Sequence, residues 1–262
     1  MTALKSSAQL SAPGEVLCEY SEDGAVLDIV LNRPSKRNAL SPPMAREITA
    51  ALKRAVRENV HMVVFRSTVN GAFCAGFDIG YMGDASSDPA EPLYELYTCL
   101  EHLPAVTVAF ADGLVVGGGV ELFLCCDLRL SSPLSTFRMP PAKLSVVYER
   151  EGIARFIRRT GLAATTELFL TGRSLTAQEA ERCGLVTRVM TEDAFLDYRA
   201  DILAGAPLAQ QAMKEIIVAL TATPGMSDER FGQLKRTVSN SLDRDEALNA
   251  FKEKRPPRFT GR

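Results

Sequence analysis

Three short apolar segments in the first half of the sequence constrain the fold more than any other feature. They are AVLDIVL at residues 25–31, HMVVFRS at 61–67 and AVTVAF at 105–110. Each is typical of a largely buried strand, and each is followed by a loop marked by glycine, asparagine or proline and then by a helical pattern. This alternation of strands and helices predicts an α/β core.

The helical patterns divide the chain into two parts. Residues 42–59 open with two prolines, which suit a first helical turn, and continue with apolar residues at helical spacing. Beyond about residue 161 strands become rare, and further helical patterns follow at residues 163–172, 176–183, 206–222 and 228–254. We therefore expect an α/β core over residues 1–200 and a helical C-terminal region over residues 201–262.

Charge and composition exclude several classes of function. Thirty lysines and arginines against thirty-two aspartates and glutamates give a net charge of -2, without a basic stripe that would hold nucleic acid. The sequence has neither a signal-peptide pattern at its start nor an apolar run of the roughly 18 residues that span a membrane. We expect a soluble cytoplasmic protein with no nucleic-acid or membrane partner. The six cysteines lack metal-ligand spacing, which favours reduced thiols and no metal site.

The segment GGGVELFLCCD at residues 117–127 contains one conspicuous polar residue, Glu121, in an otherwise apolar helical pattern. A glycine-rich helix start offers unpaired N–H groups that can bind an oxyanion, although the glycines can also serve close packing alone. A carboxylate in the first turn is favoured by the helix dipole. In apolar surroundings it must also be paired, protonated or facing a cavity, and such a carboxyl group suits proton transfer. GAFCAGFDI at residues 71–79 is a second loop of small residues that follows a strand, and it can either approach a ligand or simply pack.

Four segments, in order and spacing, resemble the signatures of the enoyl-CoA hydratase/isomerase, or crotonase, superfamily. They are IVLNRPSKRNAL (29–40), GAFCAGFDIGYM (71–82), VAFADGLVVGGGVELFLCCDLRL (108–130) and LTAQEAERCGLVTRVM (175–190). The resemblance implies a spiral of ββα units, a helical C-terminal region that forms trimers, and an acyl-CoA thioester as substrate. It implies a homotrimer or a dimer of trimers, and no cofactor apart from the coenzyme A carried by the substrate.

The resemblance also assigns the site residues. The backbone N–H groups of Phe77 and Gly118 match the family's oxyanion hole, in which one donor is worth roughly 3–4 kcal/mol in comparable sites. Glu121 matches the first catalytic glutamate. Coenzyme A is expected at Lys36, Arg37, Ala39, Ala75 and Asp78, with Phe251 and Lys254 of the basic tail as further contacts. A solvated surface is the alternative for Lys36 and Arg37, and for the tail.

The second glutamate of the hydratases is missing, because Pro141 occupies its place. Glu149 and Glu151 are near in sequence and either replace it or form a solvated first helical turn. Residues 136–152 are also similar to the matching part of methylmalonyl-CoA decarboxylase, which has a tyrosine at the position of Tyr148. That enzyme has a histidine where this chain has Phe77. The hydroxyl of Tyr148 is expected to face the acyl pocket, or to pack with its hydroxyl bonded to backbone.

Three functions follow from these residues. The first is an acyl-CoA lyase or isomerase that stabilises a thioester enolate. The second is a decarboxylase or hydrolase of a malonyl-type or branched acyl-CoA, because loss of carbon dioxide requires a stabilised enolate but no base. The third is a non-catalytic coenzyme A binding or assembly module. The presence of both Gly118 and Glu121 argues against this third function.

Overall fold

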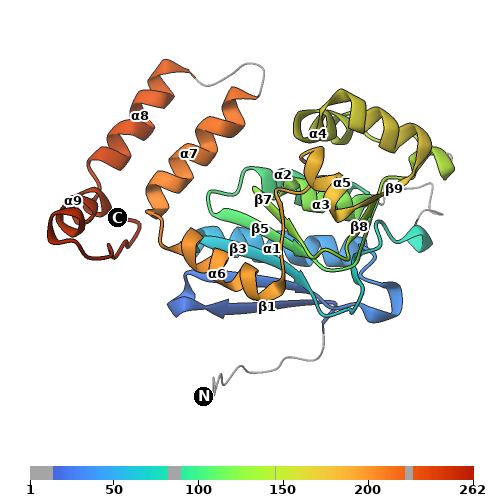
Figure 1. Ribbon diagram of the computed structural model, residues 1–262, viewed down its shortest axis with the longest axis horizontal. Coiled ribbons are helices and arrows are strands. Elements are labelled where there is room, and N and C mark those ends of the chain that lie inside the picture. Colours follow the sequence, from blue (N-terminus) through green and yellow to red (C-terminus); the bar gives the residue numbers. More distant parts are fainter. Residues whose placement is uncertain (1–13, 82–89, 145, 222–226) are drawn as a thin grey trace.

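The predicted strands form the middle of the larger of two sheets. The computed structural model describes residues 14–81, 90–144, 146–221 and 227–262, and Figure 1 shows how they are arranged. In the described residues the larger sheet has six strands in the order β1-β2-β3-β5-β7-β10. They are β1 (Val16–Ser21), β2 (Val26–Leu31), β3 (Met62–Ser67), β5 (Val106–Ala111), β7 (Leu128–Ser131) and β10 (Arg188–Val189).

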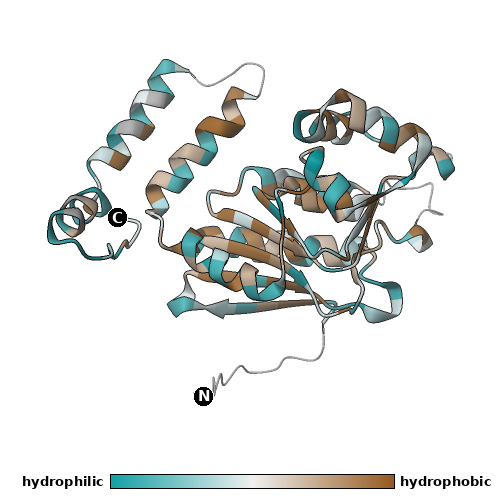
Figure 2. Cartoon of the chain, in the orientation of Figure 1, coloured by the Kyte–Doolittle hydropathy of each residue, from teal (hydrophilic) through white to brown (hydrophobic). Residues whose placement is uncertain are grey.

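All neighbours in this sheet are parallel except β1, which pairs antiparallel with β2. Met62 of β3 lies between Val26 of β2 and Val106 of β5, so the three segments of the sequence pattern are adjacent and in register. The central strands are among the most hydrophobic parts of the chain (Figure 2). Both faces are covered, as a parallel sheet requires.

A smaller sheet holds strands that the sequence pattern did not predict. It consists of β4 (Ala72–Cys74), β6 (Leu114–Val116), β8 (Thr136–Arg138) and β9 (Ser174–Thr176), in that order. The two loops expected at residues 71–79 and after residue 110 thus each contain a strand. Its three-residue strands are too short for an alternating pattern to show.

Nine α-helices occur in the described part of the chain. They are α1 (Pro42–Arg57), α2 (Glu91–Glu101), α3 (Gly118–Cys125), α4 (Arg150–Thr171), α5 (Ala177–Arg182), α6 (Glu192–Leu203), α7 (Pro207–Leu220), α8 (Asp228–Ser239) and α9 (Leu242–Glu253). Four short 3₁₀ turns lie at Glu22–Gly24, Pro34–Lys36, Ile79–Tyr81 and Pro141–Lys143. The order strand, strand, helix repeats from β1 through α4, which confirms the expected ββα architecture.

Helix α1 shows how the sequence sets an element. The Ser41 side chain caps it by accepting a hydrogen bond from the Met44 N–H at 3.3 Å, and two prolines occupy the first turn. Its apolar residues at helical spacing, including Ile48 and Leu52, are fully buried. The expected first helix is therefore confirmed, two residues shorter than its sequence pattern.

The C-terminal helices extend from one end of the core (Figure 1). The Lys214 ammonium ties α7 to the core, because it lies 2.7 Å from the Asp127 carboxylate and donates to the Ala105 carbonyl at 3.0 Å. The helical pattern over residues 228–254 is two helices rather than one, since α8 ends at Ser239 and α9 begins at Leu242. Within the described residues, no helix is long and apolar enough to cross a membrane.

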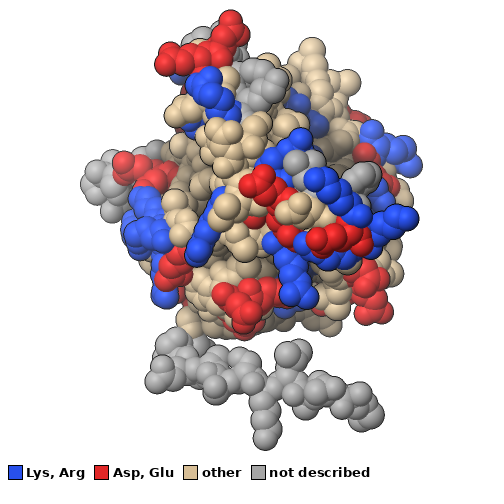
Figure 3. Space-filling model, turned by 90° about the vertical axis from the view of Figure 1, so that its left-hand side faces the viewer, with Lys and Arg blue, Asp and Glu red and all other residues tan. Residues whose placement is uncertain are grey.

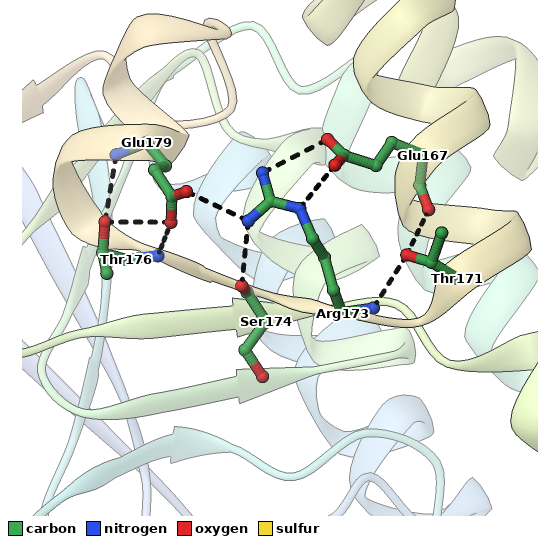
Figure 4. Close-up of polar contacts among 6 residues, drawn as sticks. All are labelled: Glu167, Thr171, Arg173, Ser174, Thr176 and Glu179. Atoms are coloured by element: carbon green, nitrogen blue, oxygen red, sulfur yellow. Dashed lines mark hydrogen bonds and ion pairs between the residues drawn. The ribbon is translucent and has the colours of Figure 1, made fainter.

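Arg173 braces the C-terminal end of α4, a helix of 22 residues (Figure 4). Its guanidinium lies 2.7 Å from the Glu167 carboxylate on α4 and 3.0 Å from that of Glu179 on α5. Thr176 and Glu179 form a reciprocal capping box at the start of α5. The backbone N–H of Thr176, followed by Arg173, lowers the pKa of Glu179 to about 2, so this brace stays charged at neutral pH.

Gly113 marks the closest approach between two loops of neighbouring ββα units. Its φ is +87°, and a Cβ atom there would lie 2.1 Å from the Gly71 carbonyl carbon. Gly24 has a similar φ of +88°, but a Cβ atom there would have no neighbour within 4 Å among the described residues.

We expect Gly113→Ala to lower the free energy of unfolding by about 3 kcal/mol, because the new methyl group overlaps backbone as well as straining φ. Gly24→Ala is the matched control and is expected to cost about 1 kcal/mol, for the strained φ alone. Chemical denaturation of both variants measures the difference. Equal losses would show that the contact between the two loops relaxes without cost.

Candidate active site

Glu121 lies in the first turn of α3, and the residue is only 3% exposed. All eight residues of this helix are buried. One carboxylate oxygen, Oε2, accepts a hydrogen bond from the Tyr148 hydroxyl, and the other, Oε1, accepts one from Nη1 of Arg155. The buried carboxylate is therefore paired, as its apolar surroundings require.

Burial has the largest effect on the pKa of the Glu121 carboxyl group and raises it above the ordinary value. The hydrogen bond from Tyr148 and the charge of Arg155 act in the opposite direction. Burial also raises the pKa of Tyr148 well above 10, and the negative charge of Glu121 adds to this shift. Tyr148 thus keeps its proton at neutral pH and acts as a hydrogen-bond donor to Glu121.

The glycines at the start of α3 allow close contacts with neighbouring elements. A Cβ atom on Gly118 would lie 2.9 Å from the Tyr97 hydroxyl and 3.5 Å from the Phe77 nitrogen. A Cβ atom on Gly119 would lie 2.7 Å from the Cys74 carbonyl oxygen. Packing therefore explains part of the glycine run, and the same packing brings the backbone of Gly118 beside that of Phe77.

The N–H groups of Phe77 and Gly118 have no hydrogen-bond acceptor among the residues that the structure describes. Phe77 forms an isolated parallel bridge with Leu40, in which Leu40 donates to Gly76 at 2.7 Å and Asp78 donates to Leu40 at 2.9 Å. Alternate N–H groups along an extended chain face opposite sides, so the Phe77 N–H is directed away from this pairing. Two unpaired donors thus lie on neighbouring segments, and that of Gly118 is one helical turn from Glu121.

The same bridge brings together most residues predicted to bind coenzyme A. Ala75 donates its N–H to the Arg37 carbonyl at 3.0 Å, which joins the loop after β4 to residues 36–40. Lys36 and Arg37 are exposed, whereas Ala39 is buried. Asp78 is also buried and pairs with Arg33 at 2.8 Å.

The tail residues are not part of this cluster. Phe251 belongs to α9 and Lys254 follows it, exposed, at the opposite end of the molecule from α4 (Figure 1). This end carries intermingled basic and acidic side chains rather than a uniform basic patch (Figure 3). Arg255, for example, pairs with Glu246 at 2.6 Å and with Glu253 at 2.5 Å.

A cavity of about 250 Å³ opens beside Glu121. It is lined by residues of α2, α3 and the start of α4, namely Tyr94, Tyr97, Thr98, Glu121, Glu149, Glu151, Gly152 and Arg155. Glu149 and Glu151 are exposed at this cavity. Pro141 is buried in a 3₁₀ turn and does not line it.

Sequence reasoning missed three residues around Glu121. Arg155 on α4 holds Glu121 and also Glu101, the last residue of α2. Tyr97 on α2 is buried and donates its hydroxyl to the Gly118 carbonyl at 2.9 Å. The sequence does not single out Arg155, because it is one of several arginines in REGIARFIRR. Tyr97 falls on the apolar face of a helix, where a tyrosine is usually a packing residue.

The family model for enoyl-CoA hydratase/isomerase matches residues 21–262. The chain belongs to the enoyl-CoA hydratase/isomerase family. Among curated relatives it is 33% identical over 253 residues to the bovine (Bos taurus) mitochondrial enoyl-CoA hydratase domain-containing protein 2, covering 90% of this chain and 84% of that protein. It is 31% identical over 255 residues to the 2,3-dehydroadipyl-CoA hydratase of Escherichia coli (strain K12), covering 92% and 98%.

Solved structures of the enoyl-CoA hydratase/isomerase family share the fold. An enoyl-CoA hydratase/carnithine racemase from Magnetospirillum magneticum superimposes with a TM-score of 0.88 at 32% identity, covering 96% of this chain and 97% of that one. Family membership and the crotonase fold, both expected from the four sequence segments, are confirmed.

Gly152 provides a test of how tightly the site is packed. A Cβ atom there would lie 2.6 Å from Cε1 of Tyr148 and 2.8 Å from Oε1 of Glu121. We expect Gly152→Ala to separate Tyr148 from Glu121 and to lower the free energy of unfolding by about 1–3 kcal/mol, because the added methyl group overpacks the site.

A crystal structure and denaturant unfolding of the variant measure both effects. Gly232→Ala on α8 is the control, since among the described residues its Cβ atom would meet only the end of the Arg236 side chain, at 3.3 Å. It is expected to leave stability unchanged or slightly raised, as alanine favours helix. An intact hydrogen bond between Tyr148 and Glu121 in Gly152→Ala would contradict the prediction.

Proposed function

We propose that this protein is a lyase or isomerase that acts on an acyl-CoA thioester by stabilising its enolate and moving one proton with Glu121. The observation that carries the proposal is the pair of unpaired N–H groups at Phe77 and Gly118, beside a buried carboxylate. Family membership supports the substrate class. The names of the curated relatives, such as 2,3-dehydroadipyl-CoA hydratase, point in the same direction.

The proposed reaction begins with the thioester carbonyl oxygen accepting both N–H groups. When Glu121 removes a proton from carbon, the electrons of the broken C–H bond pass into the enolate, and the two donors stabilise the charge on its oxygen. Glu121 then returns the proton to another carbon in an isomerisation. In a lyase reaction a leaving group departs from the neighbouring carbon, and Glu121 supplies its proton.

Coenzyme A is proposed to lie along the loops at residues 36–40 and 75–78, which the bridge between Leu40 and Phe77 holds together. Lys36 and Arg37 are exposed and available to its phosphates, while Ala39, Ala75 and Asp78 supply the backbone beside it. Phe251 and Lys254 lie at the end of the C-terminal helices, away from these two loops of the same chain. We therefore propose that they reach the ligand from a neighbouring chain of a homotrimer or a dimer of trimers.

A decarboxylase or hydrolase of a malonyl-type or branched acyl-CoA is the second candidate. Tyr148 favours it, because its hydroxyl contacts Glu121, which lines the cavity, and can donate to a substrate carboxylate. Three glutamates line the cavity, however, and would repel a substrate carboxylate. A neutral acyl group therefore fits the cavity better, and a non-catalytic role leaves the paired Glu121 unexplained.

We expect Glu121→Gln to reduce turnover by roughly two to four orders of magnitude, the usual scale for losing a general acid–base group. Acyl-CoA binding and fold should change little, since the amide keeps the shape of the carboxylate. Purified protein is first incubated with a panel of acyl-CoA thioesters, and mass spectrometry identifies the substrate. The same turnover in Glu121→Gln as in the unmodified protein would give Glu121 a purely structural role.

Hydration of crotonyl-CoA is expected to be weak, because a second carboxylate is missing at Pro141 and one acid–base group is worth about 10²- to 10⁴-fold. The absorbance of the enoyl thioester follows this reaction directly. Rapid hydration would mean that Glu149 or Glu151 replaces the missing glutamate. Substitution of each by glutamine would then identify which one acts.

A further inference from the structure

Arg155 is the buried cation that joins the proposed catalytic carboxylate to the rest of the protein. It is 5% exposed, and all three of its guanidinium nitrogens contact carboxylates. Nε and Nη2 form a two-pronged pair with Glu101 at 2.8 Å and 2.7 Å, and Nη1 contacts Oε1 of Glu121. Arg155 thus links Glu101 at the end of α2 to Glu121 on α3.

We propose that Arg155 is a positioning residue for Glu121, which it holds ionised and with Oε2 turned toward Tyr148. The proposal rests on the proposed catalytic role of Glu121. The pair with Glu101 fixes the plane of the guanidinium, and Nη1 then fixes one oxygen of Glu121. The other oxygen, Oε2, is left to Tyr148. A planar fork with a fixed direction can do this, whereas a lysine ammonium cannot.

Ionisable groups face Glu121 from α4, from the loop before α4, from α2 and from its own helix. Arg155 contacts it from α4, and the hydroxyl of Tyr148 does so from the loop before α4. Tyr97 and Glu101 face it from α2, Glu149 from the residue before α4, and Cys125 from its own helix. Arg155 is the one cation in direct contact with Glu121 within the described residues. It offsets the burial, and the repulsion from Glu101 and Glu149, that favour a protonated Glu121.

A purely structural brace between α2 and α4 is the alternative. The pair between Arg155 and Glu101 would hold these helices together whether or not Glu121 carried a charge. Although burial acts in the opposite direction, Arg155 lowers the pKa of Glu101 below its ordinary value, so this pair is itself charged. A test must therefore detect the state of Glu121 and not only the stability of the fold.

The two partners of this network are expected to move the pKa of Glu121 in opposite directions. Arg155→Gln removes a positive charge, and we expect the pKa to rise by about 1–3 units, the usual effect of an adjacent opposite charge. Glu101→Gln removes a negative charge and frees Arg155 for Glu121, so the pKa should fall. Arg158→Gln is the matched control, because Arg158 is 42% exposed and 3.6 Å from Glu101, and should cause little change.

Carbon-13 NMR of the glutamate carboxyl groups measures this titration without any substrate, with Glu121→Gln identifying the signal. Opposite shifts in Arg155→Gln and Glu101→Gln support the proposal. An unchanged Glu121 titration in both variants would overturn it. Should Arg155→Gln fail to fold, Arg155→Lys and Glu101→Gln carry the test: the first keeps the charge and loses the fork, and a small rise is expected.

Kinetics then test the link to catalysis. With the substrate found by the acyl-CoA panel, the acid limb of kcat/KM should move to higher pH in Arg155→Gln, and KM should change less than kcat. In the Glu121→Gln background the same substitution should change turnover less than about twofold, because the effect passes through Glu121. Equal losses in both backgrounds would overturn the positioning role. A protein that turns over no acyl-CoA would refute the proposed function alone, since the NMR titration is independent of it.

Discussion

The structure depends on the burial of one carboxylate. Helix α3 lies in the core with all eight of its residues buried, and Glu121 is the one ionisable group in its first turn. Moving a charge out of water costs several kcal/mol unless it is paired and hydrogen-bonded. The arrangement of α2, α4 and the loop before α4 provides those partners. The same packing that buries α3 also leaves its first N–H group, that of Gly118, without an acceptor among the described residues, beside the loop at residues 75–78.

The charges of this network do not cancel. With Glu101, Arg155 and Glu121 all ionised, two negative charges face one positive charge, and Arg158 contributes only from 3.6 Å. A proton on Glu121 leaves the pair between Arg155 and Glu101 electrically neutral. Uptake of a proton therefore relieves repulsion inside the network, whereas the contact with Arg155 favours the ionised form. Burial and this repulsion raise the pKa of Glu121, and Arg155 opposes that shift.

The sequence allowed the long strands, α1 and Glu121 to be predicted, because each has a local signal. A strand buried on both faces shows as an apolar run, and Glu121 stands out as a charge in apolar surroundings. Arg155 has no such signal, since its partners lie 34 and 54 residues away and only the packing of α2, α3 and α4 brings them together. The strands of the smaller sheet were missed for a related reason: three residues give no periodicity, and long-range pairing decides their conformation.

The roles of Tyr148 and Glu121 follow from the same electrostatics. Burial and the neighbouring negative charge raise the pKa of Tyr148 well above 10, so its hydroxyl is a poor proton source at neutral pH. It remains a good hydrogen-bond donor, and Glu121 sets its direction. Under the proposed function, proton transfer therefore falls to Glu121, while Tyr148 orients either that carboxylate or a polar group of the substrate. A substrate that takes the Tyr148 hydrogen bond for itself also frees Oε2 of Glu121, so binding and activation of the base become one event.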